Sequence, residues 1–122
     1  MTHKESQLQR NCVKWCRYAY PKNILFAIPN GGRRGKIEAG IMKAEGVLAG
    51  VADLFLMTAR NGYNGLFIEM KVGYGKQTPI QKEFEKAAID AGYRYAVCRS
   101  MDEFMETVND YLNINELKIK QL

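Results

Sequence analysis

The chain has 122 residues, of which 47% are hydrophobic, and a formal net charge of +5. This length allows one hydrophobic core and excludes two, so we expect a single domain over residues 1–122 with its core at about residues 4–112 and a peripheral C-terminal tail. Apolar runs stay well short of the roughly 20 residues of a membrane span, and the first residues do not resemble a signal sequence, which favours a cytoplasmic protein without membrane contact.

The positive charge is concentrated at the start of the chain. Residues 1–36 contain eight Lys or Arg and a single acidic residue, Glu5, for a net charge of +7, whereas the remaining residues have a net charge of −2. A cationic third of this kind suits a polyanion such as nucleic acid and predicts salt-dependent binding. Solubility alone is the alternative explanation of the same charges.

The first predicted element is a helix over about residues 4 to 19, ended by Pro21. Its apolar residues recur at helical spacing and form one stripe, Leu8, Cys12, Trp15, Cys16 and Ala19. Three residues before this stripe lies Glu5, a carboxylate at the start of the buried face, although favourable placement at a helix N-terminus explains it equally. The three cysteines, Cys98 included, lack disulfide-framework spacing, so we interpret them as buried thiols in a reducing compartment.

A short apolar strand is predicted at residues 24–28, and the loop that follows Pro29 is rich in glycine and basic residues. Glycines let main-chain N–H groups approach a phosphate, and basic side chains contact backbone charge, although any solvated loop can have this composition. We assign four residues of this loop to DNA binding, namely Asn30, Arg33, Arg34 and Lys36. Residues 37–45 are predicted either as a short helix closed by Gly46 or as a partly ordered segment.

Two strands, at residues 53–57 and 65–71, flank a segment with two Asn/Gly turn signals, which predicts an antiparallel hairpin. Because side chains alternate faces along a strand, Glu69 and Lys71 share one face of the second strand. The other face carries the apolar residues Leu66, Ile68 and Met70. Asp53 begins the first strand, so the hairpin brings it to the same end of the sheet as Glu69 and Lys71.

A helix beginning at Pro79 is predicted next, with Thr78 as N-cap and Gln81 as the partner in a capping box. Its apolar stripe comprises Ile80, Phe84, Ala87, Ala88 and Ala91. A strand at residues 94–98 should lie parallel to the strand of Glu69 through a crossover, and a last helix follows Ser100 with the apolar residues Phe104, Val108, Tyr111 and Leu112. This order predicts an α/β fold with a single small mixed β-sheet flanked by helices.

The two carboxylates predict a metal site. Close carboxylates repel each other, and Mg²⁺ is typically held by one or two carboxylates plus a substrate phosphate, so Asp53 and Glu69 suit Mg²⁺, with Mn²⁺ as a substitute. Such a metal polarises a phosphodiester and lowers the pKa of bound water, while Lys71 orients the nucleophile or neutralises charge on phosphorus. The chemistry is phosphodiester hydrolysis. An ordinary ion pair at a sheet edge is the alternative for Glu69 and Lys71 considered alone.

The arrangement Asp53…Glu69-Met70-Lys71 resembles the Asp…(Asp/Glu)-x-Lys signature of the PD-(D/E)XK nuclease superfamily, which has a restriction-endonuclease-like α-β-β-β-α-β core. Ala52 stands where the superfamily name has proline. Over about residues 5–100 the sequence is similar to the VRR-NUC domain, the virus-type replication-repair nuclease, in its stand-alone form from phages and bacteria. The similarity rests on Pro29-Asn30-Gly31-Gly32, Lys43-Ala44-Glu45-Gly46-Val47, Ala49-Gly50-Val51-Ala52-Asp53-Leu54 and Thr78-Pro79-Ile80-Gln81.

This resemblance implies site residues and their roles. Asp53, Glu69 and the Met70 backbone carbonyl would hold the metal, and Lys71 would be the catalytic lysine. Gln81 would face the site. We give this role and the role of Gln81 in the capping box equal weight. The implied catalytic set is therefore Glu5, at the outer edge of the metal, with Asp53, Glu69, Lys71 and Gln81. Lys76, in the loop after the second hairpin strand, joins the DNA-binding residues.

The resemblance also implies a substrate class and an assembly. Small stand-alone members are similar to Holliday-junction resolvases, so we expect a Mg²⁺-dependent, structure-selective DNA endonuclease that acts on branched DNA as a homodimer, in DNA repair. The alternatives are a flap, nick-directed or restriction-like nuclease and a non-catalytic nucleic-acid-binding module. A phosphatase or nucleotidase for small substrates is a third alternative, which the charge pattern disfavours because an extended basic surface exceeds what a small phosphate requires.

Overall fold

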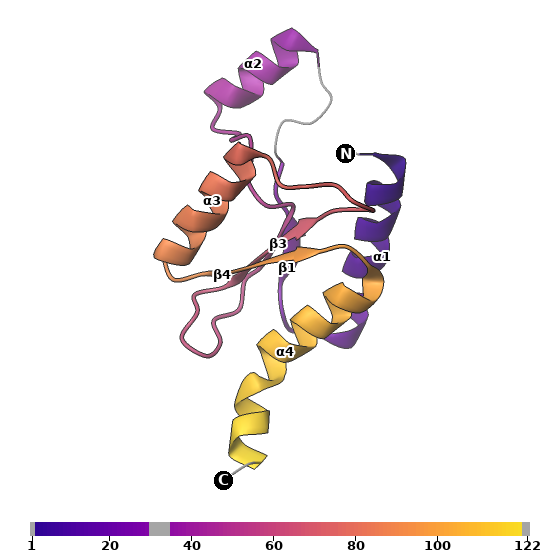
Figure 1. The fold of residues 1–122 in the computed structure, drawn as a ribbon, viewed down its shortest axis with the longest axis vertical. Coiled ribbons are helices and arrows are strands. Elements are labelled where there is room, and N and C mark those ends of the chain that lie inside the picture. Colours follow the sequence, from indigo (N-terminus) through magenta and orange to yellow (C-terminus); the bar gives the residue numbers. More distant parts are fainter. Residues whose placement is uncertain (1, 30–34, 121–122) are drawn as a thin grey trace.

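The computed structural model describes residues 2–29 and 35–120, with side chains described as far as Asn113. The elements follow the order α1, β1, α2, β2, β3, α3, β4 and α4 (Figure 1). The DNA-binding assignments of Asn30, Arg33 and Arg34 lie outside the described residues. Within the described part of the chain, we find no helix with the length and apolar character needed to span a membrane.

The sheet has four strands, β1 (Leu25–Ala27), β2 (Leu54–Leu56), β3 (Leu66–Met70) and β4 (Arg94–Cys98), which lie side by side in that order. The hairpin of β2 and β3 is antiparallel and β4 runs parallel to β3, so the predicted mixed sheet is confirmed. β1 pairs antiparallel with β2, which the sequence pattern left open. The first three strands are each one residue shorter at both ends than predicted.

A two-residue turn closes the hairpin. Asn61 and Gly62 have φ angles of 52° and 86°, and the main chains of Arg60 and Tyr63 exchange hydrogen bonds of 3.1 and 2.8 Å. A turn with two positive φ angles matches the right-handed twist of the flanking strands, which explains the preference for Asn-Gly here. In the sheet Leu54 lies opposite Ile68, a register shifted by one residue from that of the Arg60–Tyr63 pair, and this register brings Asp53 to the end of β3.

The hydrophobic core lies between one face of the sheet and the helices α1 (His3–Ala19) and α4 (Met101–Lys120) (Figure 1). Leu66, Ile68 and Met70 are buried in it, which confirms the face assigned to them. The core also includes Cys12, Cys16, Leu25, Leu54, Leu56, Cys98, Phe104, Val108, Tyr111 and Leu112. The three thiols are buried and free, as predicted. Ala19 is exposed, contrary to prediction, because it is the last residue of α1.

The opposite face of the sheet carries an aromatic cluster and α3 (Pro79–Asp90). The cluster consists of Phe26, Phe55, Phe67, Phe84, Tyr93 and Tyr95. The predicted apolar stripe of α3 is only partly correct, since Ala88 is buried but Ile80 is 51% exposed and Ala87 and Ala91 are exposed. The helix packs on the sheet mainly through Phe84, which contacts the rings of Phe67 and Tyr95.

The short helix predicted before β2 is present as α2 (Lys36–Ala44), and none of its residues is buried. It stands at one end of the molecule, next to the start of α3 (Figure 1). The segment between α2 and β2 passes close to α3 at Gly50, where φ is 89° and a Cβ atom would collide with the Ile80 side chain. Glycine therefore lets this segment reach the sheet, where it delivers Asp53.

Candidate active site

Asp53 is positioned by the sheet itself. Its Oδ2 accepts a hydrogen bond of 2.7 Å from the Met70 backbone N–H, and its carbonyl accepts one of 2.9 Å from the Ile28 N–H. The residue therefore ties together the ends of three neighbouring strands. Burial raises the pKa of the Asp53 carboxyl; the Met70 N–H opposes this shift, and the negative charges of Glu69 and Glu5 add to it. Burial above all, and the two negative charges in addition, thus make the charged form of Asp53 costly.

Glu69 is the buried charge of the site, with 1% of its surface exposed. Its Oε1 accepts a hydrogen bond of 2.5 Å from the Tyr95 hydroxyl. Its Oε2 is buried and has no hydrogen-bond partner among the described residues, and the Lys71 Nζ lies 4.0 Å from it. Burying a carboxylate costs several kcal/mol unless its lone pairs are satisfied. The arrangement leaves one carboxylate oxygen in need of a positive ligand.

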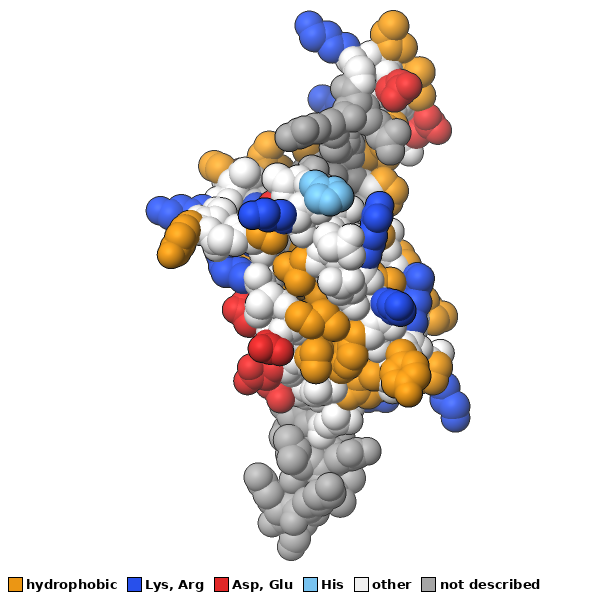
Figure 2. All heavy atoms as spheres, turned by 90° about the vertical axis from the view of Figure 1, so that its right-hand side faces the viewer, with side chains coloured by type: hydrophobic (Ala, Val, Ile, Leu, Met, Phe, Trp, Pro, Cys, Tyr) orange, Lys and Arg blue, Asp and Glu red, His pale blue; other side chains and the backbone are white. Residues whose placement is uncertain are grey.

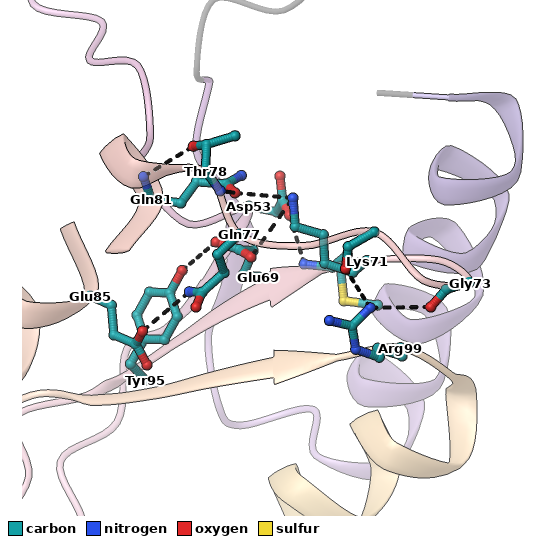
Figure 3. A network of polar contacts seen from close by, with 12 residues as sticks. Asp53, Glu69, Lys71, Gly73, Gln77, Thr78, Gln81, Glu85, Tyr95 and Arg99 are labelled. Atoms are coloured by element: carbon teal, nitrogen blue, oxygen red, sulfur yellow. Dashed lines mark hydrogen bonds and ion pairs between the residues drawn. The ribbon is translucent and has the colours of Figure 1, made fainter. Parts of the chain in front are cut away.

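Lys71 and Gln81 are joined directly. The Lys71 Nζ donates a hydrogen bond of 3.0 Å to the Gln81 Oε1, which also accepts one of 2.8 Å from the Thr78 N–H (Figure 3). The Thr78 hydroxyl in turn accepts from the Gln81 N–H, so the capping box forms as predicted. One oxygen of Gln81 therefore caps α3, as predicted, and also accepts from the Lys71 ammonium, whereas a role of Gln81 in catalysis stays a prediction.

Glu5 lies in the first turn of α1, where its N–H donates to the Thr2 hydroxyl at 3.1 Å. Its charge contributes to the raised pKa of Asp53, so it acts on the site through space. Among the described residues, His, Cys, Asp and Glu side chains do not form a group of three that could hold a metal. Glu5 therefore does not join Asp53 and Glu69 in such a group, and its place at the outer edge of the metal stays a prediction.

Tyr95 was not identified from the sequence. It lies on β4 opposite Phe67, and Glu69 follows Phe67 by two residues on the same face of β3. The sequence did place a tyrosine on a strand predicted to run beside the strand of Glu69. It could not show that the two residues meet, because short-range sequence patterns do not determine the register of two strands joined by a crossover. Burial raises the pKa of Tyr95, and the hydrogen bond to Glu69 adds to this shift, so the phenol is the donor.

The loop after Lys71 is held from the side of β4. Arg99 donates from one guanidinium nitrogen to the carbonyls of Gly73 and Gly75, at 3.2 and 2.7 Å (Figure 3). This contact, also missed from the sequence, fixes the loop that carries Lys76. Lys76 and Lys36, the first residue of α2, are both exposed.

A basic groove runs along α1. It has a volume of about 540 Å³, and its described lining consists of Ser6, Gln9, Arg10, Val13, Lys14 and Arg17. Figure 2 looks onto the side of the molecule formed by α1, where Lys and Arg side chains are spread over the face and acidic side chains lie near the top and at the lower left. The cationic character predicted for the first third of the chain is thus partly gathered on one helix.

The residues of the site suit a hard divalent cation. Such an ion prefers oxygen ligands and needs only one or two protein carboxylates when a substrate phosphate supplies the rest. The unpaired, buried Oε2 of Glu69 and the half-buried carboxylate of Asp53 meet this requirement. The chain has a single histidine, His3, at the start of α1, and its three cysteines lie in the core. The donor chemistry therefore favours Mg²⁺ or Mn²⁺ over a softer metal.

Comparisons with known proteins agree on one family. The family model of the VRR-NUC domain matches residues 2–102. A solved structure of a VRR_NUC domain protein is 27% identical in sequence and superposes with a TM-score of 0.75, over 93% of this chain and 91% of that one. No curated protein matches the sequence.

Proposed function

The chain belongs to the VRR-NUC family, and from this premise we propose that it is a Mg²⁺-dependent DNA endonuclease that hydrolyses phosphodiester bonds. Family membership implies a nuclease-type function and binding of nucleic acid. The observation that carries the proposal further is the Glu69 carboxylate, which is buried at the end of β3 with Oε2 unpaired among the described residues, on the same sheet end as Asp53.

The proposed metal ligands are the carboxylates of Asp53 and Glu69 and the backbone carbonyl of Met70. When bound, Mg²⁺ supplies polarisation of the phosphodiester and a water of lowered pKa. The Met70 N–H holds Asp53 through Oδ2, which leaves Oδ1 for the metal. A cation would also offset the repulsion between the two carboxylates, which adds to the effect of burial in raising the pKa of Asp53.

Lys71 is proposed to neutralise charge that develops on the phosphate. Its ammonium is held by Gln81 at 3.0 Å and lies 4.0 Å from Glu69, so it faces the carboxylate end of the sheet. A cation fixed in advance stabilises developing negative charge without the cost of reorganising at the moment of reaction. Gln81 is a positioning residue in this scheme, and Glu5 contributes negative charge at the outer edge of the site.

The nucleic acid is proposed to contact the basic residues around this site. Arg10, Lys14 and Arg17 line the groove along α1, and Lys36 and Lys76 are exposed. The proposal also takes branched DNA as the substrate, cut as Holliday-junction resolvases cut it. A two-fold homodimer would present two such sites to the two strands of a junction, since a symmetric dimer places the same surface on both subunits.

The decisive experiment compares cleavage of matched DNA substrates. Purified protein is incubated with four-way junction, flap, fork and linear duplex DNA in Mg²⁺ or Mn²⁺, with EDTA and the Glu69→Ala variant as controls. The proposal expects cleavage of the junction above the linear duplex, lost in both controls. Equal cutting of linear duplex would refute selectivity for junctions. Binding without cleavage under all metal conditions would instead identify a non-catalytic nucleic-acid-binding module.

A further inference from the structure

The hydrogen bond between Tyr95 and Glu69 has a direction that bears on the metal site. We infer that Tyr95 is a positioning residue, which holds Oε1 of Glu69 and thereby presents Oε2 to the divalent cation. This inference rests on the proposed function, because it takes Glu69 as a metal ligand. It assigns to the nuclease site a residue outside its Asp…Glu-x-Lys pattern.

The geometry around Glu69 is asymmetric. Tyr95 occupies one oxygen at 2.5 Å, whereas the other oxygen is buried without a hydrogen-bond partner among the described residues. In Figure 3 the carboxylate lies between the Tyr95 hydroxyl and the Lys71 ammonium. A tyrosine hydroxyl has one proton to donate, so it can satisfy one oxygen and leave the other available.

Tyr95 is itself held in place. It lies within strand β4, which pairs with β3 along its whole length, and its ring packs with that of Phe84 from α3 at a centroid distance of 6.2 Å. The hydroxyl therefore approaches Glu69 from a fixed ring in the sheet rather than from a mobile side chain. A ligand oriented in this way binds a metal without first losing rotational freedom, as outer hydrogen-bond partners of metal ligands generally ensure.

The alternative partner of Glu69 explains why orientation matters. The Lys71 Nζ is 4.0 Å from Oε2, at the limit of an ion pair. A glutamate released from Tyr95 can turn toward this ammonium and form a close ion pair. That pair would occupy the ligand oxygen and withdraw the lysine from the phosphate at the same time. Tyr95 thus keeps the carboxylate of Glu69 and the ammonium of Lys71, at the end of β3, near each other without letting them form a close ion pair.

The test is the Tyr95→Phe variant, which keeps the ring and removes only the hydroxyl. Mn²⁺ affinity is measured by isothermal titration calorimetry in the absence of DNA, for the wild type, Tyr95→Phe, Glu69→Gln and Tyr93→Phe. Tyr93 makes a matched control because its ring packs in the same aromatic cluster, on Phe55 and Phe67. We expect Tyr95→Phe to bind Mn²⁺ 10–100-fold more weakly, the range seen when outer partners of metal ligands are removed, and Tyr93→Phe to bind as the wild type does.

Cleavage provides a second measurement. In Tyr95→Phe, the Mn²⁺ concentration for half-maximal cleavage should rise by the same factor, while kcat at saturating Mn²⁺ returns toward the wild-type value. A purely structural contact would lower the urea midpoint without changing the Mn²⁺ affinity of the folded protein. Unchanged affinity in Tyr95→Phe, with loss of binding in Glu69→Gln, overturns the role of Tyr95 alone. Absence of both Mn²⁺ binding and metal-dependent cleavage in the wild type overturns the proposed function as well.

A measurement on the wild type covers the case in which Tyr95→Phe does not fold. Mg²⁺ is titrated into protein with ¹³C-labelled tyrosine rings, and the Tyr95 signals are assigned by elimination with the other Tyr→Phe variants. Because Glu69 contacts the Tyr95 hydroxyl directly, the ring signals of Tyr95 should shift with Mg²⁺ more than those of Tyr93. A Tyr95 signal that stays unmoved at saturating Mg²⁺ contradicts the inference.

Discussion

Replacing Glu69 with glutamine should uncouple the stability of the protein from divalent metal. The substitution keeps the shape of the side chain and an oxygen that can accept from Tyr95, but it removes the charge from the buried position. In the wild type, any cation that binds the folded state alone stabilises it by mass action. Glu69→Gln should therefore lose most of the stabilisation that Mn²⁺ gives, together with cleavage.

The size of the effect follows from the length of the chain. At a Mn²⁺ concentration 100 times the dissociation constant, binding to the native state contributes about 2.7 kcal/mol. An unfolding entropy of roughly 2.1 cal/mol/K per residue gives about 0.26 kcal/mol/K for 122 residues. The expected rise in Tm is the ratio of these two values, about 10 °C for the wild type, and close to zero for Glu69→Gln.

Differential scanning calorimetry in EDTA and in increasing Mn²⁺ measures the rise in Tm for the wild type and for Glu69→Gln. Glu83→Gln is the matched control, because Glu83 is exposed on α3 and the same charge is removed. The control should keep the full rise in Tm. An equal rise in Glu69→Gln and the wild type would show that Mn²⁺ binds elsewhere, and would refute the assignment of Glu69 as a ligand.

Three further predictions address the other features of the site. Gln81→Ala and Thr78→Ala should each destabilise the protein by about 1 kcal/mol in urea unfolding, because both break the capping box. Only Gln81→Ala should also lower kcat, since it releases Lys71. Equal kcat values in the two variants would contradict this. The double variant Arg10→Gln/Lys14→Gln should reduce the slope of log K against log salt for duplex binding by roughly 2. The control double variant Lys82→Gln/Lys86→Gln, on the exposed surface of α3, should keep the wild-type slope. An unchanged slope in Arg10→Gln/Lys14→Gln would exclude the α1 groove from the DNA path. Burial raises the pKa of Cys12 from 9.0 to about 12. The stability that the neutral thiol contributes is therefore complete below pH 9 and is lost as the pH rises toward 12. The free energy of unfolding should fall across this range in the wild type and fall less in Cys12→Ala.

Local signals predicted most of the fold. The Asn61-Gly62 turn predicts the hairpin because both residues tolerate positive φ angles, and the capping box predicts the start of α3 within one residue. The hairpin in turn predicts that Asp53 meets the end of β3. Each of these features is determined by residues close together in the sequence, so a single sequence is enough to predict it.

Features that depend on distant packing were missed. The contact of Tyr95 with Glu69 requires the register of two strands linked through α3, and nothing in either strand alone specifies it. The apolar stripe of α3 was assigned by periodicity, but the narrow sheet covers only part of it, so Ile80 stays half exposed. The catalytic and DNA-binding roles of the predicted residues remain predictions for the experiments above.

The order in which the site assembles follows from its connections. Nine residues separate β2 from β3, whereas 23 separate β3 from β4. The shorter loop costs less entropy to close, so Asp53 and Glu69 come together through a local contact and Tyr95 joins them through a longer-range one. A chain in the course of folding can therefore hold its two repelling carboxylates together before the residue that orients them arrives. Divalent metal present during refolding would act at this step, and its effect would appear in the rate of folding rather than only in the final stability.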